Sequence, residues 1–179
     1  MMVVCGSINN IKITAVASDF DFLGASMAAA EGEAFLYGIQ HSIENKTPFL
    51  CFSAGGGMRM MESLISLSQM TRTTLAINEL KKENLPYIVC ITDPTAGGIT
   101  ASYAMLGDIH VAEPGALISF AGARVIKATI KEELPEGFQK SEYVEKTGFV
   151  DTIIERKNLS KKIGTLLSIL LKKNSVIST

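Results

Sequence analysis

Short apolar runs alternate with longer amphipathic stretches along the chain. Apolar runs bounded by turn residues are typical of buried strands, whereas apolar positions that recur about every 3.6 residues are typical of helices. The short runs predict strands over Val3–Cys5, Ile11–Ala17, Phe49–Phe52, Tyr87–Thr92, Ile109–Ala112, Leu117–Phe120 and Val150–Ile154. The longer stretches predict helices over Ala25–Asn45, Gly57–Glu83, Gly98–Leu106, Gly122–Lys131, Gln139–Lys146 and Leu159–Lys173. This alternation indicates a layered α/β fold, and because no linker divides the chain we expect one domain over residues 1–179.

Two of the predicted helices differ in how their apolar residues are arranged. The first half of the helix after Gly57 is nearly uncharged apart from Arg59 and Glu62, so we expect it to be covered on most sides. The last helix has one apolar stripe, formed by Leu159, Ile163, Leu166, Leu167 and Leu170. Ile169 and Leu171 fall off this stripe, which predicts a surface for a partner.

The composition excludes several classes of protein. The chain has 17 basic and 18 acidic residues, a net charge of −1 and no tryptophan, so neither charge nor base stacking favours a nucleic-acid partner. It has no secretory signal, and no apolar run approaches the ~18 residues of a membrane span, so we expect no membrane partner. Cys5, Cys51 and Cys90 form no C-x-x-C pair. Their odd number and the predicted burial of two of them indicate reduced thiols in the cytoplasm and no zinc site.

Two glycine clusters follow predicted strands, at Ser53–Gly57 and Asp93–Gly98. A helix that begins there leaves backbone N–H groups without partners, and glycine lets a ligand oxygen approach them closely. We therefore predict that Gly56, Gly57, Gly97 and Gly98 form an oxyanion hole, in which one donor contributes roughly 2.7–4 kcal/mol. Tight packing of the helix starts against the strands is the alternative. Phosphate binding is another alternative, although the G-x-x-x-x-G-K-[ST] and G-x-G-x-x-G patterns are missing.

The residues that flank these clusters offer few catalytic side chains. Arg59 either pairs with Glu62, three residues later, or binds an anionic part of a substrate. Ser53, Arg59, Thr95 and Ala96 are our candidates for substrate binding, although Ser53 also fits a turn residue, because G-x-S-x-G is absent. No pair of carboxylates presents itself as acid and base. Such a site takes its base from the substrate, or it performs no chemistry.

Several linked motifs resemble one family, the β subunits of the carboxyltransferase of multi-subunit acetyl-CoA carboxylase. The motifs are Phe52-Ser-Ala-Gly-Gly-Gly-Met-Arg-Met-Met-Glu62, Asp93-Pro-Thr-Ala-Gly-Gly-Ile-Thr-Ala-Ser102, Leu106-Gly-Asp, Ala112-Glu-Pro-Gly-Ala-Leu-Ile118, Phe120-Ala-Gly-Ala-Arg-Val-Ile126 and Leu134-Pro-Glu-Gly-Phe-Gln139. The likeness runs from about Val3 to the last predicted helix, in the order of the family. It implies a crotonase-type (ClpP/crotonase) fold of stacked ββα units.

The resemblance also implies a reaction and a set of partners. The carboxyl group would pass from carboxybiotin on a biotin carboxyl carrier protein to acetyl-CoA, giving malonyl-CoA for fatty acid biosynthesis within an ATP-dependent complex. A carboxyltransferase α subunit would supply the biotin side, in an α2β2 assembly. The glycines that match Gly56 and Gly57 would hold the thioester enolate, Gly97 and Gly98 would complete the hole, and the biotin enolate would serve as the base.

The sequence departs from the family at three places. The family carries an N-terminal four-cysteine zinc ribbon, and this chain starts after it, so zinc is not expected. Gly55-Gly56-Gly57-Met58 stands where the family often has Ser-Gly-Gly-Ala, which puts a bulky side chain beside the hole. The tract Ser141–Gly148 is also shorter than usual.

Two other functions stay open on the sequence. An enoyl-CoA hydratase or isomerase of the same fold needs a carboxylate near Gly98, and Glu113 is the nearest acidic residue. A truncated subunit that binds CoA or serves as a scaffold without catalysis is the other alternative.

Overall fold

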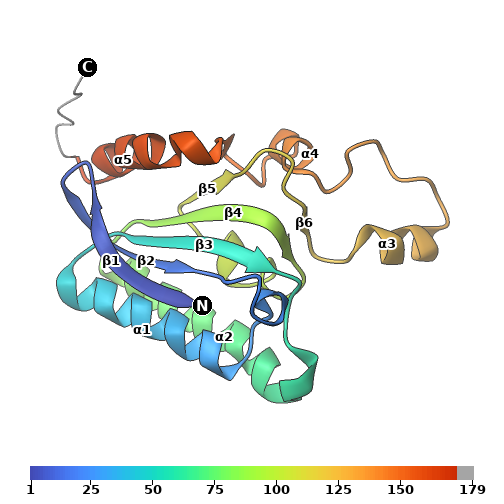
Figure 1. Cartoon of the computed structure of the whole chain (residues 1–179), viewed down its shortest axis with the longest axis horizontal. Helices are drawn as coiled ribbons and strands as arrows, with labels where there is room; N and C mark the ends of the chain where they lie inside the picture. The colour runs from blue at the N-terminus through green and yellow to red at the C-terminus, as the bar shows by residue number, and fades with distance from the viewer. Residues whose placement is uncertain (173–179) are drawn as a thin grey trace.

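The computed structural model describes residues 1–172, and a mixed sheet forms the centre of this part of the chain (Figure 1). Within it lie seven strands: β1 (Met2–Ile8), β2 (Ile11–Ala17), β3 (Phe49–Gly55), β4 (Tyr87–Ala96), β5 (Ile109–Ala112), β6 (Ile118–Ser119) and β7 (Thr152–Ile153). The strand order is β1-β2-β3-β4-β5-β7, and β6 pairs with β4. Only β1 and β2 pair antiparallel among these strands, so the carboxyl ends of β3 and β4 lie at the same edge.

Helices cover both faces of the sheet. The α-helices are α1 (Ala29–Asn45), α2 (Ser63–Lys82), α3 (Ala123–Ile130), α4 (Ser141–Lys146) and α5 (Leu159–Leu170). Short 3-10 helices lie at η1 (Leu23–Ala25), η2 (Met60–Glu62), η3 (Tyr103–Met105) and η4 (Arg156–Asn158). In Figure 1, α1 and α2 lie below the sheet, α5 lies above it, and α3 stands apart at one side.

The central strands β3 and β4 are buried on both faces, which explains their continuous apolar sequences. Side chains alternate across a strand, so Phe49 and Tyr87 pack on the side of α1 and α2, whereas Leu50 and Ile88 pack on the side of α5. All four are fully buried. At roughly 1.5–3 kcal/mol for each large apolar side chain, this two-sided burial makes the middle of the sheet the rigid part of the fold.

All seven predicted strands are present, although β1 continues to Ile8 and β4 continues to Ala96, four residues beyond its predicted end. The helix starts were placed too early. Helix α1 begins at Ala29 rather than Ala25, and α2 begins at Ser63 rather than Gly57. The reason is a contact between distant parts of the chain, because Met27 and Met58 form an isolated parallel bridge that keeps both segments extended. The helix expected from Gly98 to Leu106 is a series of turns that ends in η3.

The expected burial of two helices also needs correction. The start of α2 is not covered, since Met60, Met61, Leu64, Ile65 and Leu67 are 53–88% exposed. In α5, Ile169 is exposed as predicted, but Leu170 is 38% exposed and Leu171 is half-buried, so these two exchange their expected places. The predicted helix end at Lys173 lies outside the described residues. Within residues 1–172 we find no helix with the length and apolar character that a bilayer span requires.

Candidate functional site

The two glycine turns meet at the carboxyl edge of the sheet. Gly55 at the end of β3 pairs with Thr95 near the end of β4, so the chain leaves both strands at the same level. A Cβ atom placed on Gly97 would lie 3.0 Å from the carbonyl oxygen of Gly56 and 3.2 Å from the Cα of Gly57. A Cβ atom placed on Gly57 would lie 3.4 Å from the amide nitrogen of Gly98. The structure therefore brings together the residues that the sequence predicted to converge.

Glycine is required at this meeting point for two reasons. Gly57 has φ of +128° and Gly97 has φ of +62°, and side-chain-bearing L-residues rarely adopt such values. The close approach of the two backbones also means that a side chain on Gly97 would have to push Gly56 and Gly57 away. The sequence pattern thus encodes contact between the turns as well as their shape.

The backbone amides in the turns are not equivalent. Gly97 donates its N–H to the carbonyl oxygen of Ser119 at 3.0 Å, so it is not a free donor. Within the described part of the chain, neither Gly57 nor Gly98 donates its N–H to another residue. Neither turn opens a regular helix, since α2 begins at Ser63 and turns follow Gly98. The expectation that helix N-termini supply the free N–H groups is therefore wrong. In residues 1–172, the free donors of the two turns are the individual amides of Gly57 and Gly98.

Ser53 and Thr95 lie beneath the turns and connect the two strands. Both are fully buried, and their hydroxyl oxygens lie 3.3 Å apart. The hydroxyl of Thr95 also donates to the carbonyl oxygen of Ser53 at 2.9 Å. These bonds lie where the β3–β4 register shifts, between Ser53 and Gly55. We therefore propose that Ser53 and Thr95 position the turns, while the half-buried Ala96 leads directly into the second turn.

Arg59 is held by acidic partners and is 7% exposed. Its guanidinium donates to Glu31 at 2.6 Å, to Glu62 at 3.0 Å and to the carbonyl oxygen of Ser26 at 2.8 Å. Burial alone would lower the pKa of Arg59, but the hydrogen bonds to Glu31 and Glu62 raise it above its ordinary value. Pairing with Glu62, one of the two alternatives for Arg59, is present in the structure, whereas α2 begins only at Ser63, so Arg59 does not lie in its first turn.

Met58 occupies the space beside the second turn. A Cβ atom on Gly98 would lie 2.8 Å from Met58 Cγ and 2.9 Å from Met58 Cε. Met58 is half-buried, so its thioether packs against the glycine while part of it faces solvent. The bulky residue that the sequence places beside the predicted hole therefore packs against Gly98.

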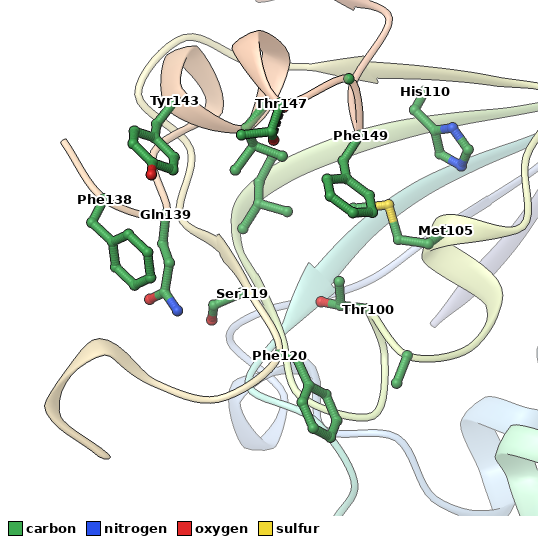
Figure 2. A pocket seen from close by; sticks show the side chains of 14 residues that line it. Thr100, Met105, His110, Ser119, Phe120, Phe138, Gln139, Tyr143, Thr147 and Phe149 are labelled. Atoms are coloured by element: carbon green, nitrogen blue, oxygen red, sulfur yellow. Dashed lines mark hydrogen bonds between the residues drawn. The ribbon is translucent and has the colours of Figure 1, made fainter. Parts of the chain in front are cut away.

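A cavity of about 730 Å³ adjoins the second turn (Figure 2). Thr100 and Ala101, which follow Gly98, form one wall, and Ser119 and Phe120 form another. The remaining lining residues are Met105, His110, Ile118, Phe138, Gln139, Tyr143, Val144, Thr147, Gly148 and Phe149. Sequence reasoning missed this cavity, because its walls come from loops and short elements that show no periodic pattern.

His110 lies at the border of the cavity but takes part in local bonds. Its Nε2 accepts the N–H of Gly107 at 3.2 Å, and its Nδ1 lies 3.8 Å from an oxygen of Asp151. Burial lowers the pKa of His110 below its ordinary value, although Asp151 opposes this shift. The imidazole is therefore mostly neutral near pH 7.

Comparison with known proteins places this geometry in a family. Residues 2–142 match the family model described as the carboxyl transferase domain. The chain belongs to the carboxyl transferase domain family. The acetyl-coenzyme A carboxylase carboxyl transferase subunit beta of Pelagibacter ubique (strain HTCC1062) is 79% identical over 179 residues, which are all of this chain and 58% of that protein. The protein of the same name from Brucella abortus (strain 2308) is 53% identical over 168 residues, which are 94% of this chain and 56% of that protein.

Solved structures support the same assignment. Transcarboxylase 12S, with methylmalonyl-coenzyme A bound, superposes with a TM-score of 0.83 at 25% identity, over 93% of this carboxyl transferase domain and 33% of that chain. A Pseudomonas malonate decarboxylase hetero-dimer superposes with a TM-score of 0.80 at 19% identity, over 93% and 75% of the two chains, and shows likeness of fold. The predicted crotonase-type α/β fold is confirmed. The chain spans somewhat more than half the length of the curated relatives it matches.

Proposed function

We propose that the protein is a carboxyltransferase β-type subunit that carries the carboxyl group from carboxybiotin to acetyl-CoA and forms malonyl-CoA. The observation that carries this proposal is the close approach of the two glycine turns, in which the N–H groups of Gly57 and Gly98 have no partner within residues 1–172. We infer that both N–H groups point to one position. Donors arranged in this way stabilise an oxygen on which negative charge develops. The names of the relatives support the substrate, and the fold supports the class of reaction.

The proposed reaction needs no acidic or basic side chain from this chain, because the biotin enolate serves as the base. Carboxybiotin releases carbon dioxide and leaves a biotin enolate, which takes a proton from the methyl group of acetyl-CoA. The acetyl-CoA enolate, whose oxygen faces Gly57 and Gly98, attacks the carbon dioxide and forms the new carbon–carbon bond. We propose that the N–H groups of Gly57 and Gly98 donate hydrogen bonds to the enolate oxygen. Gly97 would give the second turn its shape, and the exposed Gly56 would form the outer side of the first turn.

The proposed activity needs partners. We propose an α subunit and a biotin carboxyl carrier protein in a cytoplasmic, ATP-dependent complex for fatty acid biosynthesis, with an α2β2 arrangement of the two subunit types. The exposed apolar start of α2 supports a subunit contact beside the first turn, because patches of this kind usually mark such contacts. We also propose that residues 1–179 act as one domain of the longer subunit.

The alternative of a hydratase or isomerase requires a carboxylate near Gly98, and the candidate Glu113 is already engaged. Glu113 accepts two hydrogen bonds from Arg156, at 2.5 and 2.7 Å. Both oxygens of its carboxylate are therefore engaged by the guanidinium of Arg156 and are not free to meet a substrate beside Gly98. A non-catalytic CoA-binding subunit differs from the main proposal only in turnover.

Decarboxylation of malonyl-CoA in the presence of free biotin tests the proposal. The full-length subunit is mixed with its α partner, and acetyl-CoA is measured with and without biotin. Biotin-dependent turnover supports the carboxyltransferase. Hydration of an enoyl-CoA without biotin would replace it with the hydratase, and binding of CoA without any turnover would leave the scaffold.

A further inference from the structure

We propose that the hydroxyl group of Ser119 positions a substrate in the cavity beside the second glycine turn, by donating a hydrogen bond to an amide-type carbonyl oxygen. This inference rests on the proposed function and deepens it. The ureido carbonyl of biotin and the amide carbonyls in the pantetheine arm of CoA share this chemistry. Separate KM measurements for the two substrates distinguish these sources.

The Ser119 side chain is buried in the cavity wall, but its hydroxyl stays accessible. The residue lines the cavity and is 6% exposed. Its Oγ forms no hydrogen bond within residues 1–172, and the fully occluded side-chain oxygens without a partner in that part of the chain are those of Ser18 and Gln139. Figure 2 shows the Ser119 side chain pointing into the space between Thr100 and Gln139. The hydroxyl is therefore open to a ligand in the cavity.

The backbone of Ser119 is bonded directly to the second glycine turn. Its carbonyl oxygen accepts the N–H of Gly97 at 3.0 Å, and the residue pairs with Ala96 where β6 meets the end of β4. The hydroxyl thus projects from a strand that is held against the segment leading to Gly98. This attachment places the Ser119 donor on the cavity wall next to the proposed hole, so that one bound substrate meets both.

The neighbouring polar side chains on this wall have their donors engaged. Thr100 donates its hydroxyl hydrogen to the carbonyl oxygen of Thr95 at 3.1 Å. The Nε2 of Gln139 donates to the carbonyl oxygen of Ala121 at 2.7 Å. A carbonyl oxygen in the cavity needs a donor, and an unmade hydrogen bond to a desolvated group is unfavourable. Beside the second turn, Ser119 is the side chain that supplies it.

The surroundings of the hydroxyl fit an apolar skeleton with a few polar groups. Phe120 and Phe149, which are 69% and 67% exposed, stand at the cavity border and offer faces for such a skeleton. The ring of Tyr143 packs against Phe138, at 5.6 Å between centroids, and its hydroxyl lies across the cavity from Thr100 (Figure 2). A small number of polar groups in an apolar cleft is the usual arrangement of a small-molecule site.

The decisive variant is Ser119→Ala, which removes the donor and little volume. It is measured in the full-length subunit with its α partner, by biotin-dependent decarboxylation of malonyl-CoA. Ser119→Thr keeps a hydroxyl at the same position, in a residue type that strands favour, and tests rescue. Ser160→Ala makes the same chemical change at an exposed position of α5, outside the cavity lining, and serves as the control.

We expect Ser119→Ala to raise one KM about tenfold, the effect of one lost hydrogen bond, and to change kcat less than about twofold. Ser119→Thr should leave the same KM close to the unmodified value. A rise in the KM for biotin assigns the hydroxyl to the ureido carbonyl, and a rise in the KM for malonyl-CoA assigns it to the pantetheine arm. If neither KM moves in Ser119→Ala, or if Ser119→Thr raises the same KM equally, the inference is overturned.

A binding measurement covers a variant that fails to assemble with the α partner. Calorimetry then compares the dissociation constants of biotin and of CoA for the full-length Ser119→Ala subunit and the unmodified subunit. Binding of one probe weakened about tenfold supports the positioning role. Equal constants for both probes, or no binding of either probe by the unmodified protein, overturn it.

Failure of the proposed function has a different signature. If the unmodified complex shows no biotin-dependent turnover, the carboxyltransferase proposal falls. The same calorimetry, on the complex and its Ser119→Ala variant, then tests Ser119 alone, with the same two outcomes.

Discussion

Arg59 donates to Glu31 at 2.6 Å, and the two side chains are 7% and 6% exposed. Glu31 lies in the first turn of α1 and also accepts the N–H of Ala28, so the pair ties the start of α1 to the segment that follows Gly57. The first glycine turn is therefore anchored through a buried charge pair. Arg59 contributes to the site by holding the turn, with its donors already engaged inside the protein.

Removal of Arg59 should destabilise the fold strongly. In Arg59→Met, Glu31 is left buried without its cation, and breaking a buried pair from one side costs roughly 3–5 kcal/mol. Urea unfolding measures the loss. Arg72→Met is the matched control, because the Arg72–Glu33 pair is 38% and 66% exposed and such pairs contribute roughly 0–1 kcal/mol. Equal losses in the two variants would contradict the anchoring role.

Gly97→Ala should separate the two turns. The new methyl group would meet the carbonyl oxygen of Gly56 at 3.0 Å in a backbone conformation that alanine rarely adopts. We expect biotin-dependent decarboxylation to fall roughly 10²–10³-fold, as for loss of one oxyanion donor. Gly6→Ala is the control, since a Cβ atom there meets no atom within 4 Å and φ is not positive. Activity of Gly97→Ala close to that of the control would argue against the proposed hole.

Glu62 should make stability depend on acid pH. The N–H of Ala29 donates to Glu62 and, together with Arg59, holds the pKa of this carboxyl below its ordinary value near 4.5. A lowered pKa in the folded state stabilises the protein above pH 4.5, and this contribution is lost as pH falls through the folded pKa. Unfolding midpoints of Glu62→Gln and the unmodified protein should therefore differ near neutral pH and converge in acid.

Glu79→Gln is the control for this pH series, because it removes one negative charge from an exposed pair with Lys82 on α2. If the difference between Glu62→Gln and the unmodified protein stayed constant down to about pH 3, the hydrogen bond from Ala29 would not be stabilising the charged form of Glu62.

The three cysteines should differ sharply in reactivity. Cys51 and Cys90 are buried in β3 and β4, whereas Cys5 is exposed. Burial raises the pKa of Cys51 to about 12 and also raises that of Cys90, so neither forms the reactive thiolate at about pH 8. Iodoacetamide should modify Cys5 in the native protein and all three after denaturation, as read by peptide mass spectrometry. Native labelling of Cys51 at the rate of Cys5 would show that β3 opens.

The central strands could be predicted because a strand that is buried on both faces has a continuous apolar sequence. Phe49–Phe52 and Tyr87–Thr92 are continuous apolar runs, and both are strands in the structure. The meeting of the glycine turns was also foreseeable, since neighbouring parallel strands end at one edge. The start of α2 was not foreseeable, because the bridge between Met27 and Met58 joins segments far apart in the sequence.

The side-chain contacts around the glycine turns were harder to predict than the meeting of the turns themselves. The pairing of Arg59 with Glu62 followed from their spacing, but the stronger contact with Glu31 depends on how α1 packs. The position of Gln139 depends on a loop that folds against β6, and no periodic pattern marks such a position. Local sequence therefore indicated that two glycine turns meet, while packing decides which side chains surround them.

Strand β4 pairs with β5 over Ile88–Ile91 and with β6 at Thr95–Ala96, so its two halves are paired with different strands. Pairing on both halves restricts the movement of β4 and of the glycine turn that follows it. In the proposed reaction, the amide of Gly98 beyond the end of β4 would already be in place when the chain has folded, so no movement of the backbone would be needed during turnover.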